Sequence, residues 1–208
     1  EQILHGPVAL EIIVAEGKTL TAVSELELTS KRLKFRQLEL NQPNHPGVIT
    51  AKGDFDFVQS PPELTGQLQL NQLDLQAETG QPVKLSGTIQ IKGNLERYSG
   101  QFDLKNHGIG IADAQLAGDF TGTQEIFSLQ DLRGQWLGGT LNGQAQFSWR
   151  EGWELKAQLS GKDINPHGLD PQLNGQLNLD LQADIDSDDK GAPQGLLQLQ
   201  LHHSTLLN

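Results

Sequence analysis

The sequence predicts an all-β protein built on a long antiparallel meandering sheet that curves around an apolar trough. One short phrase of alternating apolar and polar residues recurs seven times in the 208 residues, with a glycine at a fixed place in each copy. No stretch of ten or more residues has apolar residues at helical spacing. Aromatic residues make up only 5% of the chain, whereas a small closed sandwich usually anchors its core on large aromatic side chains. These observations favour a sheet with a soft, aliphatic face.

Each copy of the phrase has an apolar residue, a polar slot, glycine, a polar residue and then further apolar residues at alternate positions. Strict alternation is typical of a strand with one apolar and one solvated face. The glycine shares the parity of the apolar residues, so we expect it on the apolar face, where it removes side-chain volume and lets the backbone bend. Asn-Gly pairs normally predict hairpin turns, but both pairs in this chain lie inside alternating phrases, where we expect strand. The seven groove glycines are Gly53, Gly66, Gly87, Gly100, Gly118, Gly143 and Gly175.

Predicted strands follow one another along the chain with little between them. The first two are expected over 8–14 and 20–28, joined by a turn at 16–18. The run 33–40 changes parity midway, which indicates a β-bulge. The seven repeats predict strands at 51–57, 64–70, 85–91, 98–104, 116–120, 141–147 and, lengthened by continued alternation, 173–185; further strands are expected at 153–159 and 197–201.

Turn-forming residues separate these strands. Loops rich in proline, glycine and asparagine are expected at 41–47, 60–62 and 80–82, and the irregular stretch 161–171 has room for a short helix near 165–169. The repeats begin 13 to 32 residues apart. A solenoid keeps a fixed period, so this variation favours an antiparallel meander.

The chain is interpreted as a single segment, 1–208, of a larger repeat-built protein. It contains no Met, no charged-then-apolar leader and no apolar run of about 18 residues, so we expect neither a signal peptide nor a membrane span within it. Cys is also absent, which excludes disulfides, thiolate metal sites and a Cys nucleophile. A chain without Cys fits the periplasm, although many cytosolic proteins share this feature.

The net charge and the distribution of Lys and Arg narrow the range of partners that we expect. The net charge is −11, and Lys and Arg are scattered, with Lys31 and Arg32 the only adjacent pair. Nucleic acid binding depends on clustered cations that meet phosphates, so no nucleic acid partner is expected. Electrostatic docking on an anionic membrane surface is disfavoured for the same reason.

The residues offer no catalytic or metal-binding constellation. The six histidines lie in loops or at strand ends, and no two are spaced for a helical chelate. The acidic stretch 184–191 resembles a calcium loop only superficially: counted from Asp184 it lacks the required glycine and glutamate, and counted from Asp186 the glycine is in place but Lys190 and Leu197 occupy ligand positions. No Gly-x-Ser-x-Gly elbow or dinucleotide fingerprint occurs. We therefore expect no enzyme activity, no metal and no cofactor.

One region carries a family resemblance. Residues 129–143, with Leu-Arg-Gly-Gln-Trp-Leu-Gly-Gly-Thr-Leu-Asn-Gly at their end, resemble a Leu-x-Gly-Gly-x-Leu-x-Gly phrase of TamB and other AsmA-like proteins. Trp149 and the run 153–157 resemble the strand pair that continues this phrase, and 165–175 resemble the connector into the next strand. The similarity is best from about 85 to 185.

The resemblance implies a fold, a place and a function. The fold is an open U-shaped sheet, a β-taco groove with an aliphatic interior, in the periplasm. In this family an anchor outside the present segment holds the chain in the inner membrane, and the far end engages an outer-membrane assembly barrel, TamA; no barrel-docking end is recognised within residues 1–208, so no direct contact of this segment with such a barrel is expected. The implied work is transport of phospholipids between the membranes in support of outer-membrane biogenesis.

Two hypotheses follow. In the first, a groove shields phospholipid acyl chains, and the head group stays in water. In the alternative, the chain is a closed β-sheet module that spans the periplasm as a structural or protein-interaction scaffold, with its aliphatic core packed against a second sheet. The residues expected to line the groove are Phe55, Leu68, Leu70, Ile89, Ile91, Phe102, Leu104, Phe120, Leu141, Phe147, Leu177 and Leu179.

Overall fold

The described part of the computed structural model is almost entirely β-strand. It covers residues 3–14, 18–41, 46–76, 83–107, 113–150, 152–168, 170–187 and 192–207. The expected turn at 80–82 lies outside these residues, and so do residues 16 and 17 of the turn at 16–18, residues 42–45 of the loop at 41–47 and residues 188–191 of the stretch 184–191. The strands are β1 (Leu4–Val14), β2 (Lys18–Leu28), β3 (Arg32–Asn41), β4 (Val48–Asp56), β5 (Glu63–Asp74), β6 (Lys84–Gly93), β7 (Tyr98–His107), β8 (Asp113–Gly122), β9 (Ile126–Trp136), β10 (Gly139–Ser148), β11 (Glu154–Ile164), β12 (Asn174–Ser187) and β13 (Pro193–Leu207).

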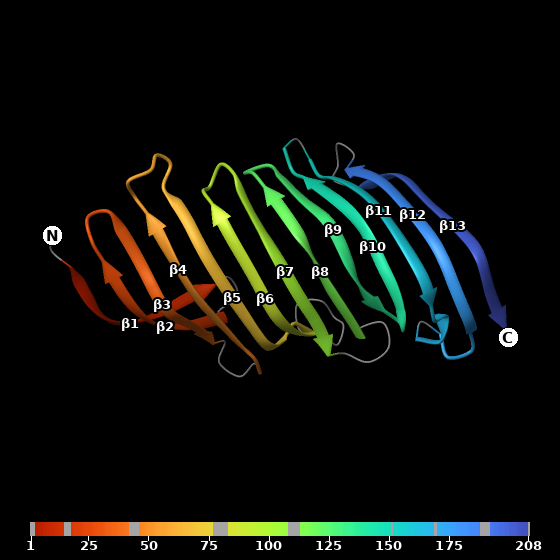
Figure 1. Ribbon diagram of the computed structural model, residues 1–208, viewed down its shortest axis with the longest axis horizontal. Helices are drawn as coiled ribbons and strands as arrows, with labels where there is room; N and C mark the ends of the chain where they lie inside the picture. The colour runs from red at the N-terminus through yellow and green to blue at the C-terminus, as the bar shows by residue number, and fades with distance from the viewer. Residues whose placement is uncertain are drawn as a thin grey trace. The chain divides into compact units, whose positions relative to one another are not determined.

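The strands pair in chain order. The sheet order runs from β1 to β13, and every described pairing register is antiparallel. The prediction of an all-β antiparallel meander is therefore confirmed (Figure 1). The chain divides into two compact units: unit 1 is Glu1–Gly100 with Leu104–His107, and unit 2 is Gln101–Asp103 with Gly108–Asn208. That residues 1–208 act as one groove segment stays a prediction.

In unit 1 the registers bring the repeat residues to one face. The pairing of β4 with β5 sets Gly53 opposite Gly66, and the pairing of β5 with β6 sets Leu68 opposite Ile89. Directly opposed residues of an antiparallel pair point to the same side of the sheet. The phrase that alternates along each strand thus becomes a continuous apolar surface across neighbouring strands.

In unit 2 directly opposed residues of successive strand pairs likewise form rows of side chains that cross several strands on one face. Most residues of these rows are large and apolar, and Gly143 and Gly161 each lie between leucines of the two neighbouring strands. Three rows run from β9 to β13: Gly134, Leu141, Gly161, Leu179, Leu201; Leu132, Gly143, Leu159, Leu181, Leu199; and Phe127, Phe147, Leu155, Ile185, Gly195.

Side chains of adjacent strands occupy the space above several glycines. A Cβ on Gly143 would lie 2.2 Å from the Gln158 carbonyl oxygen and 2.7 Å from Cδ2 of Leu159. A Cβ on Gly53 would lie 2.5 Å from Cζ of Phe35, its partner across the β3–β4 pair. These two glycines therefore admit neighbouring side chains and backbone, and do not leave empty holes.

Bulges interrupt several of the ladders. The parity change predicted within 33–40 is confirmed, because the β3–β4 register shifts between Phe35 and Leu38. Other register shifts lie beside Gln72 in β5 and Asp163 in β11, which have positive φ angles of 48° and 56°. At these bulges a side chain of the next strand accepts the backbone N–H: Ser86 Oγ accepts from Gln72 at 3.0 Å and Asn178 Oδ1 from Asp163 at 2.9 Å.

The best-packed part of unit 2 is the connection between β11 and β12. The expected short helix is a single 3-10 turn, Pro166–Gly168. Ile164 is fully buried, Pro166 is nearly so, and Leu137 in the β9–β10 turn is buried with them. The Asn165 N–H donates to the Leu137 carbonyl at 2.9 Å, which ties the two connections together.

Candidate functional site

The candidate site is the apolar face, meaning the side of each unit that carries the repeat residues and glycines. In unit 1 five of the predicted residues lie on β4, β5 and β6. Leu70 is buried, and the others are half-buried. They lie on three adjacent strands, β4, β5 and β6, and the registers bring them together: Phe55, Leu68, Leu70, Ile89 and Ile91.

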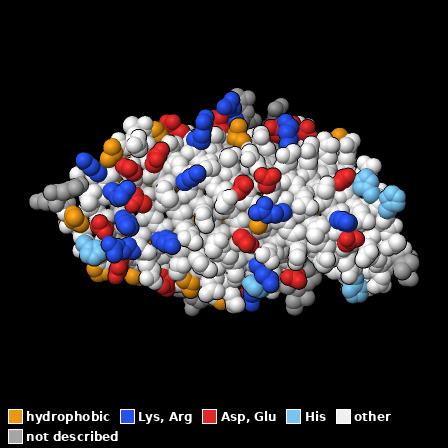
Figure 2. All heavy atoms as spheres, viewed as in Figure 1, with side chains coloured by type: hydrophobic (Ala, Val, Ile, Leu, Met, Phe, Trp, Pro, Cys, Tyr) orange, Lys and Arg blue, Asp and Glu red, His pale blue; other side chains and the backbone are white. Residues whose placement is uncertain are grey.

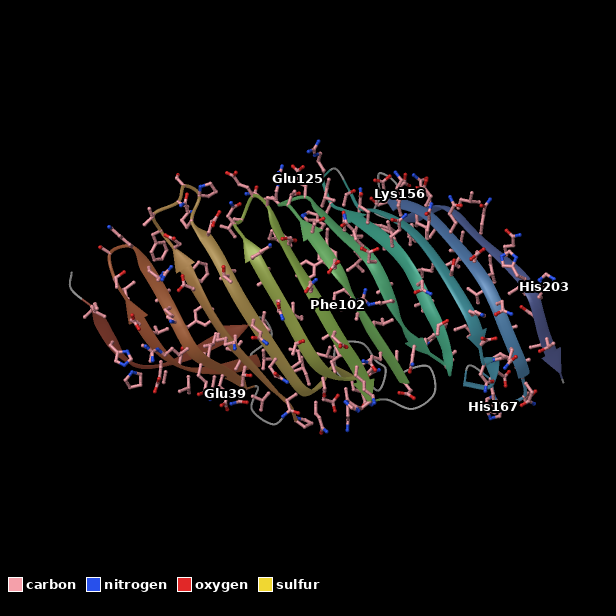
Figure 3. All side chains as sticks on the ribbon, viewed as in Figure 1. Glu39, Phe102, Glu125, Lys156, His167 and His203 are labelled. Atoms are coloured by element: carbon pink, nitrogen blue, oxygen red, sulfur yellow. The ribbon has the colours of Figure 1, made fainter. Side chains whose placement is uncertain are left out.

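Two predicted residues lie on β7, one in each unit. Leu104 belongs to unit 1 and Phe102 to unit 2, and both are half-buried. Phe102 is labelled in Figure 3. A Cβ on Gly118 of β8 would lie 3.3 Å from Cε1 of Phe102. The ring therefore packs beside the glycine of the next repeat, as shared parity predicts.

The other predicted residues of unit 2 lie on β8, β10 and β12. Phe120 of β8 is buried, Leu141 of β10 is half-buried and Phe147 is 39% exposed. Leu177 and Leu179 of β12 are half-buried, and Leu177 lies opposite Ile164. The rows bring Leu141 and Leu179 onto one line with Gly161 between them.

Several residues of this face were missing from the sequence prediction. Most belong to β9, β11 and β13, which contain no copy of the glycine phrase, although alternation in β11 was a usable signal; two belong to β12, beyond its copy of the phrase. Pairing register places them beside the predicted residues: Phe127, Leu129, Leu132, Leu155, Leu159, Leu181, Ile185, Leu197, Leu199 and Leu201.

The apolar face is only partly shielded from water. Among the described residues just seven hydrophobic side chains are buried. The chain exposes 13,879 Å², whereas a compact monomer of this mass would expose about 9,500 Å². The excess means that most of the aliphatic side chains keep accessible surface, which a sheet packed against a second layer would remove. This arrangement can receive alkyl chains over a wide area.

The opposite, polar face carries scattered charges of both signs (Figure 2). Four glutamines lie in register across β10 to β13, and part of this row lines an open depression of about 310 Å³. The row is Gln144, Gln158, Gln182 and Gln198. Ser128, Lys156 and Asp184 also line the depression.

One polar cluster superficially resembles a catalytic triad. The Ser160 hydroxyl donates to Asp180 Oδ1 at 2.6 Å, and His202 Nε2 lies 2.8 Å from Asp180 Oδ2. These two hydrogen bonds hold the pKa of the Asp180 carboxyl below its usual value, with Ser160 the larger cause. A hydrolase needs the histidine between serine and aspartate. The aspartate is central here, so the serine has no base.

Two kinds of feature are absent from the described residues. No three His, Asp or Glu side chains within the described ranges converge to hold a metal ion. A helix long and apolar enough to cross a membrane is likewise not found in the part of the chain that the structure describes.

Comparison with known proteins agrees with the sequence resemblance. The family model for the N-terminal domain of TamB matches residues 35–206, which include β3 in large part and all strands from β4 to β12. No curated protein and no solved structure gives a significant match. Since the family model covers well over half of the 208 residues, the chain belongs to the TamB N-terminal domain family.

Proposed function

We propose that the apolar face shields the acyl chains of phospholipids while they move between the inner and outer membranes. The observation that carries the proposal is the half-buried aliphatic surface, continuous across β4–β6 in unit 1 and across β9–β13 in unit 2. In this proposal the sheet curves into an open U-shaped groove, and the groove-lining residues contact the tails.

Family membership supports the setting. The TamB family is periplasmic, works in transport and assembly and not in catalysis, and has a role in outer-membrane biogenesis together with TamA. A phospholipid that crosses the periplasm needs a surface that keeps its tails from water. The apolar face supplies such a surface without any cofactor.

The energetics suit movement along the face. Each CH₂ group removed from water contributes about 0.8 kcal/mol. A face of Leu, Ile and Val makes non-directional contacts, so neighbouring positions hold a tail with similar free energy. A tail can then move from row to row without a deep trap. Strong fixed charges would create such traps, and none of the predicted groove residues is charged.

Native mass spectrometry of the chain purified from cells that have an outer membrane tests the proposal. We expect phospholipid masses to co-purify with the folded chain. Leu181→Asp should remove them, because Leu181 lies in a central row of the apolar face. Gln182→Asp is the matched control, since it places the same charge one residue away on the polar face. A lipid-free folded chain, or equal loss in both variants, would contradict the proposal.

A further inference from the structure

The two ends of the apolar face in unit 2 differ. At one end, the aromatic end, Phe127, Phe147, Trp149 and Trp153 gather where β9 begins, β10 ends and β11 begins. The other end, the packed end, is the cluster of Leu137, Ile164 and Pro166 beside Trp136. In Figure 3 Glu125 and Lys156 are labelled near the first end of these strands, and His167 marks the second.

The packed end has no room for a ligand. Ile164 is 0% exposed and Leu137 8%. A Cβ on Gly168 would lie within 2.4 Å of Cδ2 of Leu137, so the 3-10 turn fits tightly against the β9–β10 turn. A tail that follows the strands must therefore stop before this cluster.

The aromatic end is open to solvent. Phe147 is 39% and Trp149 41% exposed, although their ring centroids are 5.8 Å apart and Trp153 lies 6.5 Å from Phe147. The Trp149 indole N–H donates to the Gln124 carbonyl at 2.7 Å, which fixes its polar edge toward the β8–β9 turn. Tryptophan with one apolar and one hydrogen-bonding side is typical of a boundary between lipid tails and water.

Charges of both signs stand beside this boundary. The Arg150 guanidinium, in the turn after β10, pairs with the Glu125 carboxylate, with Nε to Oε2 at 2.6 Å. Both side chains are well exposed, so the pair can exchange partners at little cost. A zwitterionic phospholipid head group brings one phosphate and one ammonium, which matches a cation and a carboxylate side by side.

The length of the face fits a lipid tail. Leu141 and Phe147 are six residues apart in β10, which corresponds to about 20 Å of strand. The tails of one membrane leaflet span about 15 Å. A tail that begins at the aromatic end thus ends before it reaches the packed end.

From these observations we infer that a bound zwitterionic phospholipid lies along β10 and β11, with its head group at the aromatic end and its tails directed toward the packed end. The inference rests on the proposed function and adds the orientation of the lipid. It assigns Trp149, Trp153 and Arg150 to the head-group boundary.

The three tryptophans are built-in probes of this orientation. Trp136→Phe leaves fluorescence only from Trp149 and Trp153, whereas the double variant Trp149→Phe/Trp153→Phe leaves only Trp136. Each variant is loaded from phosphatidylcholine vesicles that contain a nitroxide label either on the head group or at the methyl end of one tail. Because nitroxides quench at short range, the ratio of head-label to tail-label quenching reports orientation within a single variant.

We expect head-label quenching to exceed tail-label quenching several-fold in Trp136→Phe, and the order to reverse in the double variant. Equal ratios in both variants, or the opposite order, would overturn the orientation. Native mass spectra of the loaded chains separate this failure from that of the proposed function: equal ratios with lipid bound refute the orientation alone, whereas absence of bound lipid refutes both. Circular dichroism of each variant verifies that the sheet is intact.

Discussion

Placing a charge at Ile89 separates an open apolar face from a packed core. Ile89 is half-buried in β6, opposite Leu68 of β5. Complete burial of such a side chain contributes about 1.5–3 kcal/mol, so half-burial contributes about 1 kcal/mol. The poor strand propensity of Asp adds at most about 1 kcal/mol. Ile89→Asp should therefore cost about 2 kcal/mol and leave a domain of ordinary stability folded.

Ile164→Asp is the matched contrast, because Ile164 is fully buried in the packed connection of unit 2. Loss of a buried aliphatic side chain costs about 2–5 kcal/mol. An unpaired buried carboxylate adds several kcal/mol more. The sum is comparable to the whole stability of a domain, so this variant should unfold unit 2 at room temperature.

Urea titration followed by circular dichroism measures both losses, and lipid co-purification measures function. We expect Ile89→Asp to stay folded but to lose bound phospholipid, since its carboxylate would meet the tails. If Ile89→Asp unfolded as completely as Ile164→Asp, the face would be a closed core. A folded Ile89→Asp chain with its full complement of lipid would refute the acyl-chain site in unit 1.

Three further changes test the local structure. Gly143→Ala should destabilise the β10–β11 pair by about 1–3 kcal/mol, because its methyl group would meet the Gln158 carbonyl; a urea midpoint unchanged from the parent would refute this. Asn178→Ala should cost about 1 kcal/mol, because the Asp163 N–H at the bulge loses its acceptor, and faster amide exchange at that N–H is the specific sign. Asp180 has a lowered pKa in the folded chain, so its contribution is present above the ordinary value of 3.8 and is lost as the pH falls through the folded value. Melting curves taken through acid should show this loss in the parent and not in Asp180→Asn.

The alternating phrases predicted much of the fold because strand periodicity is local. The observed strands are longer than the predicted segments, because hydrogen bonding to neighbouring strands continues past the alternating residues. The segment 197–201 lies within β13, Pro193–Leu207, and the segment 116–120 lies within β8, Asp113–Gly122. In β3 the parity change was readable as a bulge, since apolar residues flank it on both sides.

Strand β9 was missed because its bulge breaks the pattern. The registers of β9 with both neighbours shift near Gln130 and Asp131, and Asp131 has a positive φ of 49°. Apolar residues before and after the bulge therefore differ in parity, and neither half is long enough to stand out. Because β9 was not predicted, its residues Phe127, Leu129 and Leu132 were also missing from the predicted site.

The packed end could not be predicted from local pattern. Ile164 lies beyond the alternating part of β11, and Leu137 lies in a turn. Their burial depends on the connection after β11 folding back onto the β9–β10 turn, a contact between residues far apart in sequence. The asymmetry between the two ends of the face is consequently a property of the tertiary structure.

Photo-crosslinking on the two faces tests the central claim most directly. A photoreactive residue at Ile89 or Leu181 stands on the apolar face, and the same residue at Gln90 or Gln182 stands one position away on the polar face. In cells, phospholipid should attach to the first two positions and not to the second two. Equal labelling of both faces, or labelling of the polar face alone, would contradict an apolar face that shields acyl chains.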